Sequence, residues 1–225
     1  MNFDRHRFDI AVSTNDTAKL FAARGGAEGV VVVASSQTGG RGRLGRRFYS
    51  PSGGLYMSLI LRPRFSDFTL ITPAAAVAVC RALGSLGFDC GIKWVNDIYK
   101  DGKKVCGILT ESNVEQGWAV LGVGINTVCP GPGAPDIAGW LYDGTADNRA
   151  VEDAVLEQFD RVYSRLPDKE FIEYYRQKSC LPGKTLLIGG REYKYEGIGD
   201  DLSLIASSGG VISRFTCGDV SIKTV

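Results

Sequence analysis

Short apolar runs separated by glycine, proline and polar breaks dominate the first 128 residues of the chain. Runs of this kind are typical of buried β-strands. They predict strands over residues 7–12, 30–34, 55–62, 91–99, 103–111 and 118–128, the fourth interrupted by a polar Asn-Asp pair. Beyond residue 181, short alternating runs separated by Gly and Asp turns predict a small β-barrel.

Four other segments carry helical spacing, namely residues 18–24, 69–84, 151–166 and 169–179. The second is rich in alanine, and the third repeats apolar residues with the spacing of an amphipathic face. Ser13, Thr14 and Asn15 stand just before the first predicted helix, where such residues cap free N–H groups. The pattern therefore predicts an α+β fold, a mixed β-sheet with packed helices over residues 1–180, and a separate barrel domain over residues 181–225.

Length and charge limit the kinds of function that this fold can serve. The chain has 225 residues, which suits one compact unit with a small appendage, and its 26 lysines and arginines nearly balance 25 aspartates and glutamates. Proteins built around duplex nucleic acid more often carry a basic excess over the whole domain. We therefore expect positive charge to be local, in a pocket, and we expect no DNA target.

The cysteines and the N-terminus indicate the compartment. Six cysteines, Cys217 among them, are scattered without a Cys-x-x-Cys pair, and His6 is the one histidine, which argues against a zinc centre and a histidine-based triad. The N-terminus is polar and shows no signal-peptide pattern, and no window approaches the roughly 18 apolar residues that a membrane span needs. We expect a cytoplasmic protein with reduced thiols and no membrane association.

The stretch from residue 37 to residue 54 carries the strongest chemical signal. It contains Gly40-Arg41-Gly42-Arg43-Leu44-Gly45 directly after a predicted strand. Glycine lets the backbone approach a ligand, and the arginine fork matches carboxylate and phosphate oxygens. The same letters satisfy the dinucleotide pattern G-x-G-x-x-G, but Pro51 and the glycines after it exclude the helix that this pattern must open. A disordered Arg-Gly tail that binds RNA is a further alternative, although this stretch lies between two predicted strands.

Six segments carry candidate binding chemistry in their order along the chain: Ser13-Thr14-Asn15, Gln37-Thr38, Gly40 to Arg46, Lys93-Trp94-Val95-Asn96-Asp97, Lys103 to Leu109, and Gly122-Val123-Gly124-Ile125-Asn126. Together they resemble the catalytic domain of biotin protein ligases. Val95 stands where the family usually has proline, and Phe48 stands where it usually has tryptophan. The resemblance implies the class II aminoacyl-tRNA-synthetase-like fold of biotin and lipoate ligases with an SH3-like C-terminal domain. Because a predicted strand begins near Arg7, we expect a short form of the enzyme, without an N-terminal DNA-binding domain.

The resemblance further implies the reaction and its residues. Such ligases use ATP and Mg²⁺ to form biotinyl-5'-AMP and then transfer biotin to one lysine of a biotin carboxyl carrier domain. Lys104, Arg43 and Arg41 match the catalytic cations. The positions that match ligand contacts are Ser13, Thr14 and Gln37 at the ureido head of biotin, Asn126 near the adenine, Phe48 in an aromatic lid, and Asn15, Gly40, Gly42, Gly107 and Gly124 along the ligand.

Several interpretations stay open beside these matches. Asn96 and Asp97 are candidates either for orienting phosphate or Mg²⁺ or for a satisfied turn, while Arg46 and Arg47 suit a solvated rim. Lipoate ligases and octanoyl transferases share the implied fold but differ in the glycine-rich motif. An RNA- or nucleotide-binding module without catalysis is the alternative from another class. The sequence leaves open whether the protein is a monomer or a homodimer.

Overall fold

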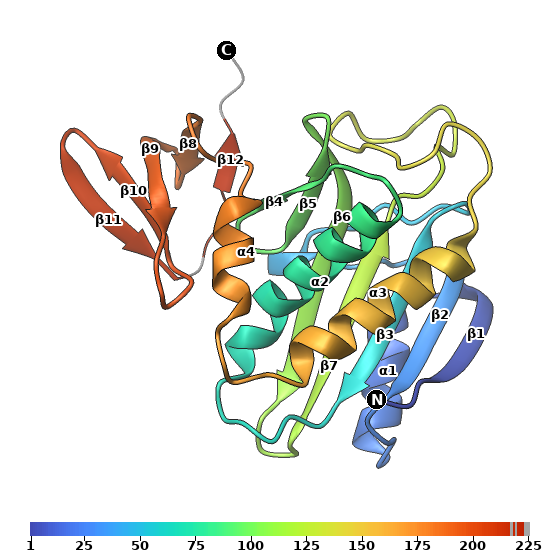
Figure 1. Ribbon diagram of the computed structural model, residues 1–225. Coiled ribbons are helices and arrows are strands. Elements are labelled where there is room, and N and C mark those ends of the chain that lie inside the picture. The colour runs from blue at the N-terminus through green and yellow to red at the C-terminus, as the bar shows by residue number, and fades with distance from the viewer. Residues whose placement is uncertain (217, 219, 223–225) are drawn as a thin grey trace.

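The computed structural model describes residues 1–216, 218 and 220–222, so Cys217 lies outside the described residues. Two β-sheets organise the chain, a seven-stranded mixed sheet and a five-stranded antiparallel sheet (Figure 1). The strands of the larger sheet are β1 (Asp4–Ala11), β2 (Val30–Gln37), β3 (Leu55–Leu61), β4 (Gly91–Lys93), β5 (Asp97–Lys100), β6 (Lys103–Asn113) and β7 (Trp118–Ile125). They lie in the order β1-β2-β3-β7-β6-β5-β4.

Connection length decides how these strands pair. β1 and β2 are parallel and are joined across one face by α1 (Thr14–Ala23), because parallel neighbours need a crossover. The other neighbours in the sheet are antiparallel. The long pairing of β6 with β7 runs from Cys106 to Asn113 on β6. β3, β7 and β6 thus form the centre of the sheet, where strands are paired on both sides.

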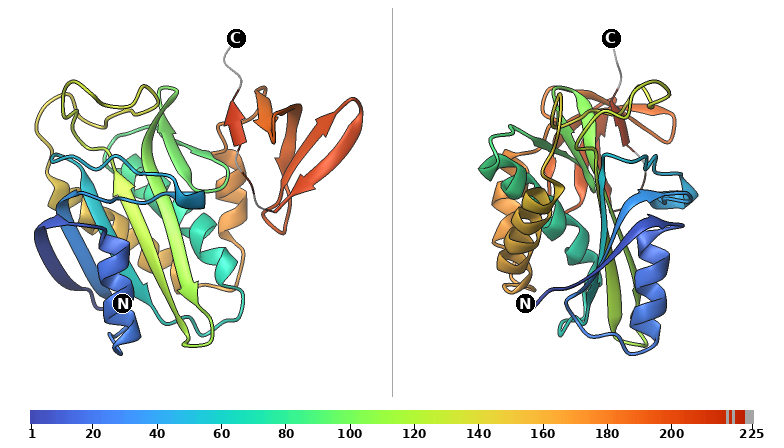
Figure 2. Two further views of the ribbon diagram at one scale, coloured as in Figure 1. Left: turned by 180° about the vertical axis from the view of Figure 1, so that it is seen from behind. Right: turned by 90° about the vertical axis from the view of Figure 1, so that its right-hand side faces the viewer.

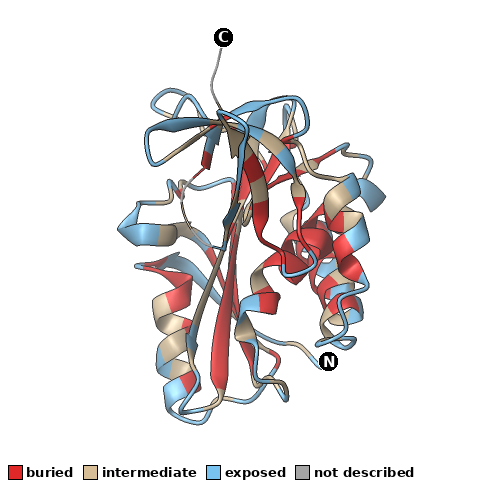
Figure 3. Cartoon of the chain, turned by 90° about the vertical axis from the view of Figure 1, so that its left-hand side faces the viewer, coloured by how far each residue is buried: buried red, intermediate tan, exposed pale blue. Residues whose placement is uncertain are grey.

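Helices cover the two faces of the sheet unequally. On one face, α2 (Ile71–Ser85) and α3 (Asn148–Tyr163) pack against each other, and α4 (Phe171–Gln177) lies beside α2. On the opposite face, α1 packs on β2, β3 and β7. Figure 2 shows α1 alone on its side of the sheet. The buried residues concentrate in the central strands and in the layer of α2 and α3 (Figure 3).

The apolar character of α2 corrects one expectation from the sequence. Residues 68 to 85, which form the short turn η2 (Phe68–Leu70) and α2, reach the length and mean hydropathy of a membrane span, so the expectation that no window does so was wrong. However, 72% of this window is buried inside the molecule. Its alanines pack between the sheet and α3, which is the position of a core helix.

The smaller sheet contains β8 (Thr185–Ile188), β9 (Arg191–Ile198), β10 (Leu204–Ser208), β11 (Val211–Phe215) and β12 (Val220–Ile222). It is antiparallel throughout, with β11 and β12 at its edges. Two side chains of the larger unit bond to its β9–β10 region, since Trp94 Nε1 donates to Leu202 O at 2.9 Å and Arg176 Nε donates to Ile198 O at 2.9 Å. The smaller sheet is therefore docked against the segment that contains Trp94.

The predicted elements agree closely with the observed ones. The mixed α+β architecture is as predicted, and the C-terminal strands form an antiparallel sheet that is consistent with the predicted SH3-like domain. Trp94 is buried. The first helix begins earlier than predicted, at Thr14, with Ser13 as its N-cap. The polar pair Asn96-Asp97 interrupts the predicted fourth strand, which becomes β4 and β5. The boundary between the two domains at residue 181 stays a prediction.

Candidate functional site

An open cavity of about 150 Å³ lies on the face of the sheet that carries α1, next to the N-terminus of that helix. Its wall combines α1, the turn before β5, the central strands and the loop of residues 38–54 between β2 and β3, called the arginine-glycine loop below. The residues that line it are Ser13, Thr14, Asn15, Gln37, Arg41, Gly42, Arg43, Leu44, Arg46, Arg47, Phe48, Tyr56, Met57, Asn96, Asp97, Lys104, Gly107, Ile108, Leu109, Gly122, Val123, Gly124 and Gly218. Segments far apart in the sequence thus meet at one place.

Glycines on the central strands make room for this cavity. Side chains alternate across a strand, so residues that pair across neighbouring strands share a face. Gly124 pairs with Gly107 on β6 and with Tyr56 on β3. On the same face of β7, Val120 packs beneath α1. This face of the central strands forms the floor of the cavity. It is covered by α1 at one end, whereas at the other end Gly107 and Gly124 leave it without side chains.

The ring of Phe48 lies directly over this bare floor. A methyl group added at Gly124 would lie 2.6 Å from Phe48 Cε1, and one added at Gly107 would lie 2.9 Å from Phe48 Cε2. The ring also meets Tyr56 edge to face, with centroids 6.4 Å apart. Burial raises the pKa of Tyr56, and its hydroxyl donates to Pro51 O at 2.7 Å. Phe48 thus lies over this part of the cavity, and its role as an aromatic lid stays a prediction.

The arginine-glycine loop folds back on itself as a hairpin. Phe48 N donates to Gly40 O at 2.9 Å, and Gly42 N donates to Arg46 O at 2.7 Å. A Cβ at Gly40 would lie 2.6 Å from Phe48 O, so glycine lets the two arms close. Leu44 at φ 56° and the next glycine reverse the chain at the tip. No helix follows, which agrees with rejecting the dinucleotide pattern.

Neutral polar groups gather at the α1 end of the cavity. Gln37 Oε1 accepts from Thr14 N at 2.8 Å, and its amide nitrogen donates to Ser50 Oγ at 2.9 Å. Ser58 Oγ lies 2.8 Å from Thr14 Oγ1 and donates to Asn15 Oδ1 at 2.6 Å. Thr14, Asn15 and Ser58 are buried. Buried donors and acceptors held in fixed positions suit a ligand head group with both N–H and C=O groups.

Ser13 serves the helix as well as the cavity. Its side chain accepts from Asp16 N at 3.4 Å, which makes it the N-cap of α1. Capping and lining the cavity are compatible, because a helix N-terminus also favours anions and polar groups.

The three predicted catalytic cations all line the cavity, and each has a partner within the protein. Lys104 Nζ lies 2.6 Å from Asp97 Oδ1, and Arg41 Nη2 lies 2.7 Å from Asp16 Oδ2. Arg43 donates to Asn96 Oδ1 at 3.2 Å. The carboxylates of Asp97 and Asp16 offset the charges of Lys104 and Arg41, whereas the neutral amide of Asn96 leaves the charge of Arg43 in place. A bound anion has to replace these contacts.

Arg43 also connects the loop to the C-terminal part of the chain. Its Nη2 donates to Gly218 O at 3.2 Å, and Gly218 lines the cavity. Asn96, which accepts from Arg43, donates through Nδ2 to Ile108 O at 2.7 Å. Asn96, in the turn before β5, and Gly218 therefore both position this arginine.

Two of the predicted ligand-binding residues stand apart from the cavity lining. Gly40 closes the base of the hairpin. Asn126 lies just beyond β7 and donates through Nδ2 to Lys104 O at 3.1 Å, so it positions the backbone that carries Lys104. The contact predicted between Asn126 and the adenine stays a prediction. Arg46 and Arg47, expected to be rim residues, belong to the lining.

Tyr56 and Ser58 were not predicted from the sequence, whereas Gly122 belongs to the predicted segment from Gly122 to Asn126 without an assigned role. Ser58 pairs with Gly122 across the strands, and a Cβ at Gly122 would lie 2.2 Å from Asn15 Oδ1. The signal for Gly122 was present, since it stands two residues before Gly124 and strand alternation places both on one face. Tyr56 and Ser58 needed the register of β3 with β7, which one sequence does not supply.

The comparisons with known proteins point to one family. Residues 9–126 match the family described as the Biotin/lipoate A/B protein ligase family. A biotin--[acetyl-CoA-carboxylase] ligase of Mycobacterium tuberculosis is 30% identical over 95% of this chain and 88% of its own length. A bifunctional ligase/repressor BirA of Bacillus spizizenii is 44% identical over 52% of this chain, a match that spans only 38% of that longer relative.

Among solved structures, the chain is similar to a biotin protein ligase from Aquifex aeolicus in complex with biotin and ATP. The TM-score is 0.85, the sequence identity is 26%, and 99% of each chain is covered. The likeness therefore extends through the C-terminal sheet as well as the larger unit.

Proposed function

Because the chain belongs to the biotin/lipoate A/B protein ligase family, we propose that it is an ATP-dependent biotin protein ligase. It activates biotin as biotinyl-5'-AMP and transfers the biotinyl group to a lysine of a biotin carboxyl carrier domain. The observation that carries this proposal is that one cavity combines neutral hydrogen-bonding groups with cationic side chains. Neutral hydrogen-bonding groups of Thr14, Asn15 and Gln37 lie at the α1 end, Lys104 lies against the glycine floor, and Arg41 and Arg43 line the same cavity from the loop.

The first chemical step brings two anions together. An oxygen of the biotin carboxylate forms a bond to the α-phosphorus of ATP, and the bond from that phosphorus to the pyrophosphate oxygen breaks. At 4 Å and an effective dielectric constant of 20, two unit charges repel by about 4 kcal/mol. Lys104 lies against the floor, with Nζ 3.2 Å from the Cβ position of Gly107. From there its ammonium can face both the carboxylate and the phosphate, while Arg41 and Arg43 contact phosphate oxygens.

Mg²⁺ enters this proposal as the ion that accompanies ATP and neutralises phosphate charge. Within the described residues, Asp97 is the one carboxylate that lines the cavity, and no cluster of three metal-ligating side chains is present. Asp97 Oδ1 is buried beside Lys104 without a well-aligned hydrogen bond. One carboxylate fits an ion held mainly by nucleotide oxygens and water. Asp97 would hold it, with Asn96 beside it.

The second step transfers the acyl group. The deprotonated amine of the carrier lysine attacks the biotinyl carbonyl carbon, the bond to the phosphate oxygen breaks, AMP leaves, and the new amide nitrogen releases its extra proton to solvent. This route requires no covalent enzyme intermediate, because the adenylate is already activated. Phe48 and the hairpin lie over the floor, where they would shield the mixed anhydride from water. We further propose a carrier domain of a biotin-dependent carboxylase as the partner, since two relatives bear the name of acetyl-CoA-carboxylase ligases. The cytoplasmic location, the absence of a DNA target and the oligomeric state stay predictions.

The test is the release of pyrophosphate from ATP and Mg²⁺ with either biotin or lipoate. We expect release with biotin, and we expect Lys104→Ala to reduce it roughly 100- to 1000-fold, the usual cost of losing a charge-stabilising group. Lys103→Ala is the matched control, because Lys103 is exposed and bonds to Asp136 O. Release with lipoate alone would reassign the enzyme within its family. Retention of RNA without pyrophosphate release would favour a binding module, and wild-type activity of Lys104→Ala would remove this lysine from the mechanism.

A further inference from the structure

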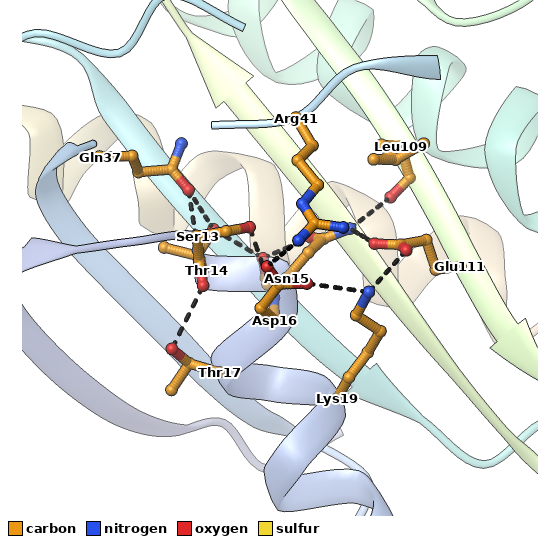
Figure 4. Close-up of polar contacts among 11 residues, drawn as sticks. Ser13, Thr14, Asn15, Asp16, Thr17, Lys19, Gln37, Arg41, Leu109 and Glu111 are labelled. Carbon is orange, nitrogen blue, oxygen red and sulfur yellow. Dashed lines mark hydrogen bonds and ion pairs between the residues drawn. The ribbon is translucent and has the colours of Figure 1, made fainter. Parts of the chain in front are cut away.

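A chain of charged contacts links the loop to α1 and β6 on the α1 side of the cavity (Figure 4). Arg41 Nη2 lies 2.7 Å from Asp16 Oδ2. The other oxygen of Asp16 lies 2.9 Å from Lys19 Nζ, which in turn lies 2.7 Å from Glu111 Oε1. Two carboxylates and two cations thus form a linear network with no net charge.

The two cations are not equally bound. Lys19 contacts both carboxylates; its burial lowers its pKa, but the hydrogen bonds to Glu111 and Asp16 outweigh this, and the pKa is raised. Arg41 contacts Asp16 alone within the network, and its side chain is 55% exposed. Exposed ion pairs of this kind are weak. Arg41 is therefore the member that can leave at the smallest cost.

Asp16 also keeps favourable contacts after Arg41 leaves. It lies in the first turn of α1, where the helix dipole favours a carboxylate. Lys19 stays in contact with it on the same helix. The network therefore has a stable arrangement without Arg41 as well as with it.

We propose that Asp16 is a positioning residue that holds Arg41 on α1 in the unliganded enzyme and competes with the ligand phosphate for its guanidinium. This inference rests on the proposed function, in which Arg41 contacts phosphate. A ligand that uses Arg41 must first break the contact with Asp16, so the contact weakens the apparent affinity for ATP. Asp16 acts through Arg41 and does not touch the reacting atoms.

The test is the Asp16→Asn variant, which keeps the shape of the side chain and the N-cap geometry while removing its charge. We expect the KM for ATP to fall about threefold with kcat unchanged, because Arg41 is released for the phosphate. Asp16→Glu restores the charge and should return KM to the wild-type value. In an Arg41→Ala background, Asp16→Asn should leave KM unchanged, since the competing partner is gone.

Glu157→Gln is the matched control, because it removes a carboxylate from an exposed ion pair with Arg161 on α3. It should leave both constants at wild-type values. A rise in KM, no change in KM, or an equal fall in the Arg41→Ala background would each overturn the role of Asp16. Failure of the wild-type enzyme to release pyrophosphate with biotin would instead refute the proposed function, which this design keeps separate. Thermal melting of each variant checks that it is folded.

Discussion

Gly124 determines how much space the cavity offers above its floor. The Cβ position of this glycine points into the cavity, 2.6 Å from the Phe48 ring. Contacts this short do not occur between real carbon atoms, so a methyl group there must displace the ring or the ligand. The small size of Gly124 is therefore a requirement of the site, and its backbone conformation is not the cause, because it lies in a regular strand.

Gly124→Ala should weaken biotin binding about tenfold, or about 1.4 kcal/mol, because the methyl group fills part of the cavity. Stability should change little, since Phe48 lies on a loop that can move aside. Titration calorimetry with biotin measures the effect. Gly144→Ala is the control, because a methyl group at Gly144 would meet no atom within 4 Å. Equal affinity in Gly124→Ala and wild type would show that biotin does not use this part of the floor.

Among the secondary-structure elements, the edge strand β1 depends on an ionic anchor. Glu152 on α3 has a side chain that is 1% exposed, and it lies 2.8 Å from Arg5 Nε and 2.9 Å from Arg7 Nη1. A buried carboxylate with two arginine partners has its charge compensated, whereas removing it leaves both arginines without this partner. Through this contact α3, which follows in sequence more than 130 positions later, fixes the first strand.

Glu152→Gln should lower the free energy of unfolding by about 2 kcal/mol, because hydrogen bonds between charged groups are lost at a buried position. Urea unfolding followed by circular dichroism measures this value. Glu157→Gln on the same helix should change it by less than about 0.5 kcal/mol, since that ion pair is exposed. An identical urea midpoint for Glu152→Gln and wild type would contradict the anchoring role.

The strands and helices could be predicted because each carries its own pattern of apolar residues. The N-cap at Ser13 and the break at Asn96 are local signals of the same kind. The contacts that organise the site are not local. Arg41 meets Asp16 across 25 positions, and Arg43 meets Gly218 across 175 positions. The motifs therefore identified residues that line the cavity, but they did not identify the residues that position these side chains.

In the molecule as a unit, the site is shared between the two sheets. Trp94 donates to Leu202 O, and Arg43 donates to Gly218 O, so the smaller sheet is bonded to two segments that form the cavity wall. A ligand that orders the cavity wall should therefore stabilise both sheets and not the loop alone. We expect this effect to appear in the global stability of the protein.

Biotin together with ATP should raise the melting temperature by roughly 5 to 10 °C when the ligands are about 100-fold above their dissociation constants. This range follows from about 2.7 kcal/mol of linkage and the usual 2 to 4 °C per kcal/mol for a chain of this size. Differential scanning fluorimetry with separate and combined ligands measures it, with lipoate plus ATP as the control. No rise with the combined ligands would refute binding to the native state.

The internal partners of the three cations have a consequence for the choice of ligand. Asp97 and Asp16 pair with Lys104 and Arg41, and the neutral amide of Asn96 accepts from Arg43, so a ligand must replace contacts that these cations already make. Inorganic phosphate and the many other small anions of a cell gain little by displacing a single partner. Only a molecule that replaces several of these contacts at once binds tightly, and an acyl-adenylate has the length and the charge to do so. The contacts that these cations make within the protein would then provide selectivity against abundant small anions.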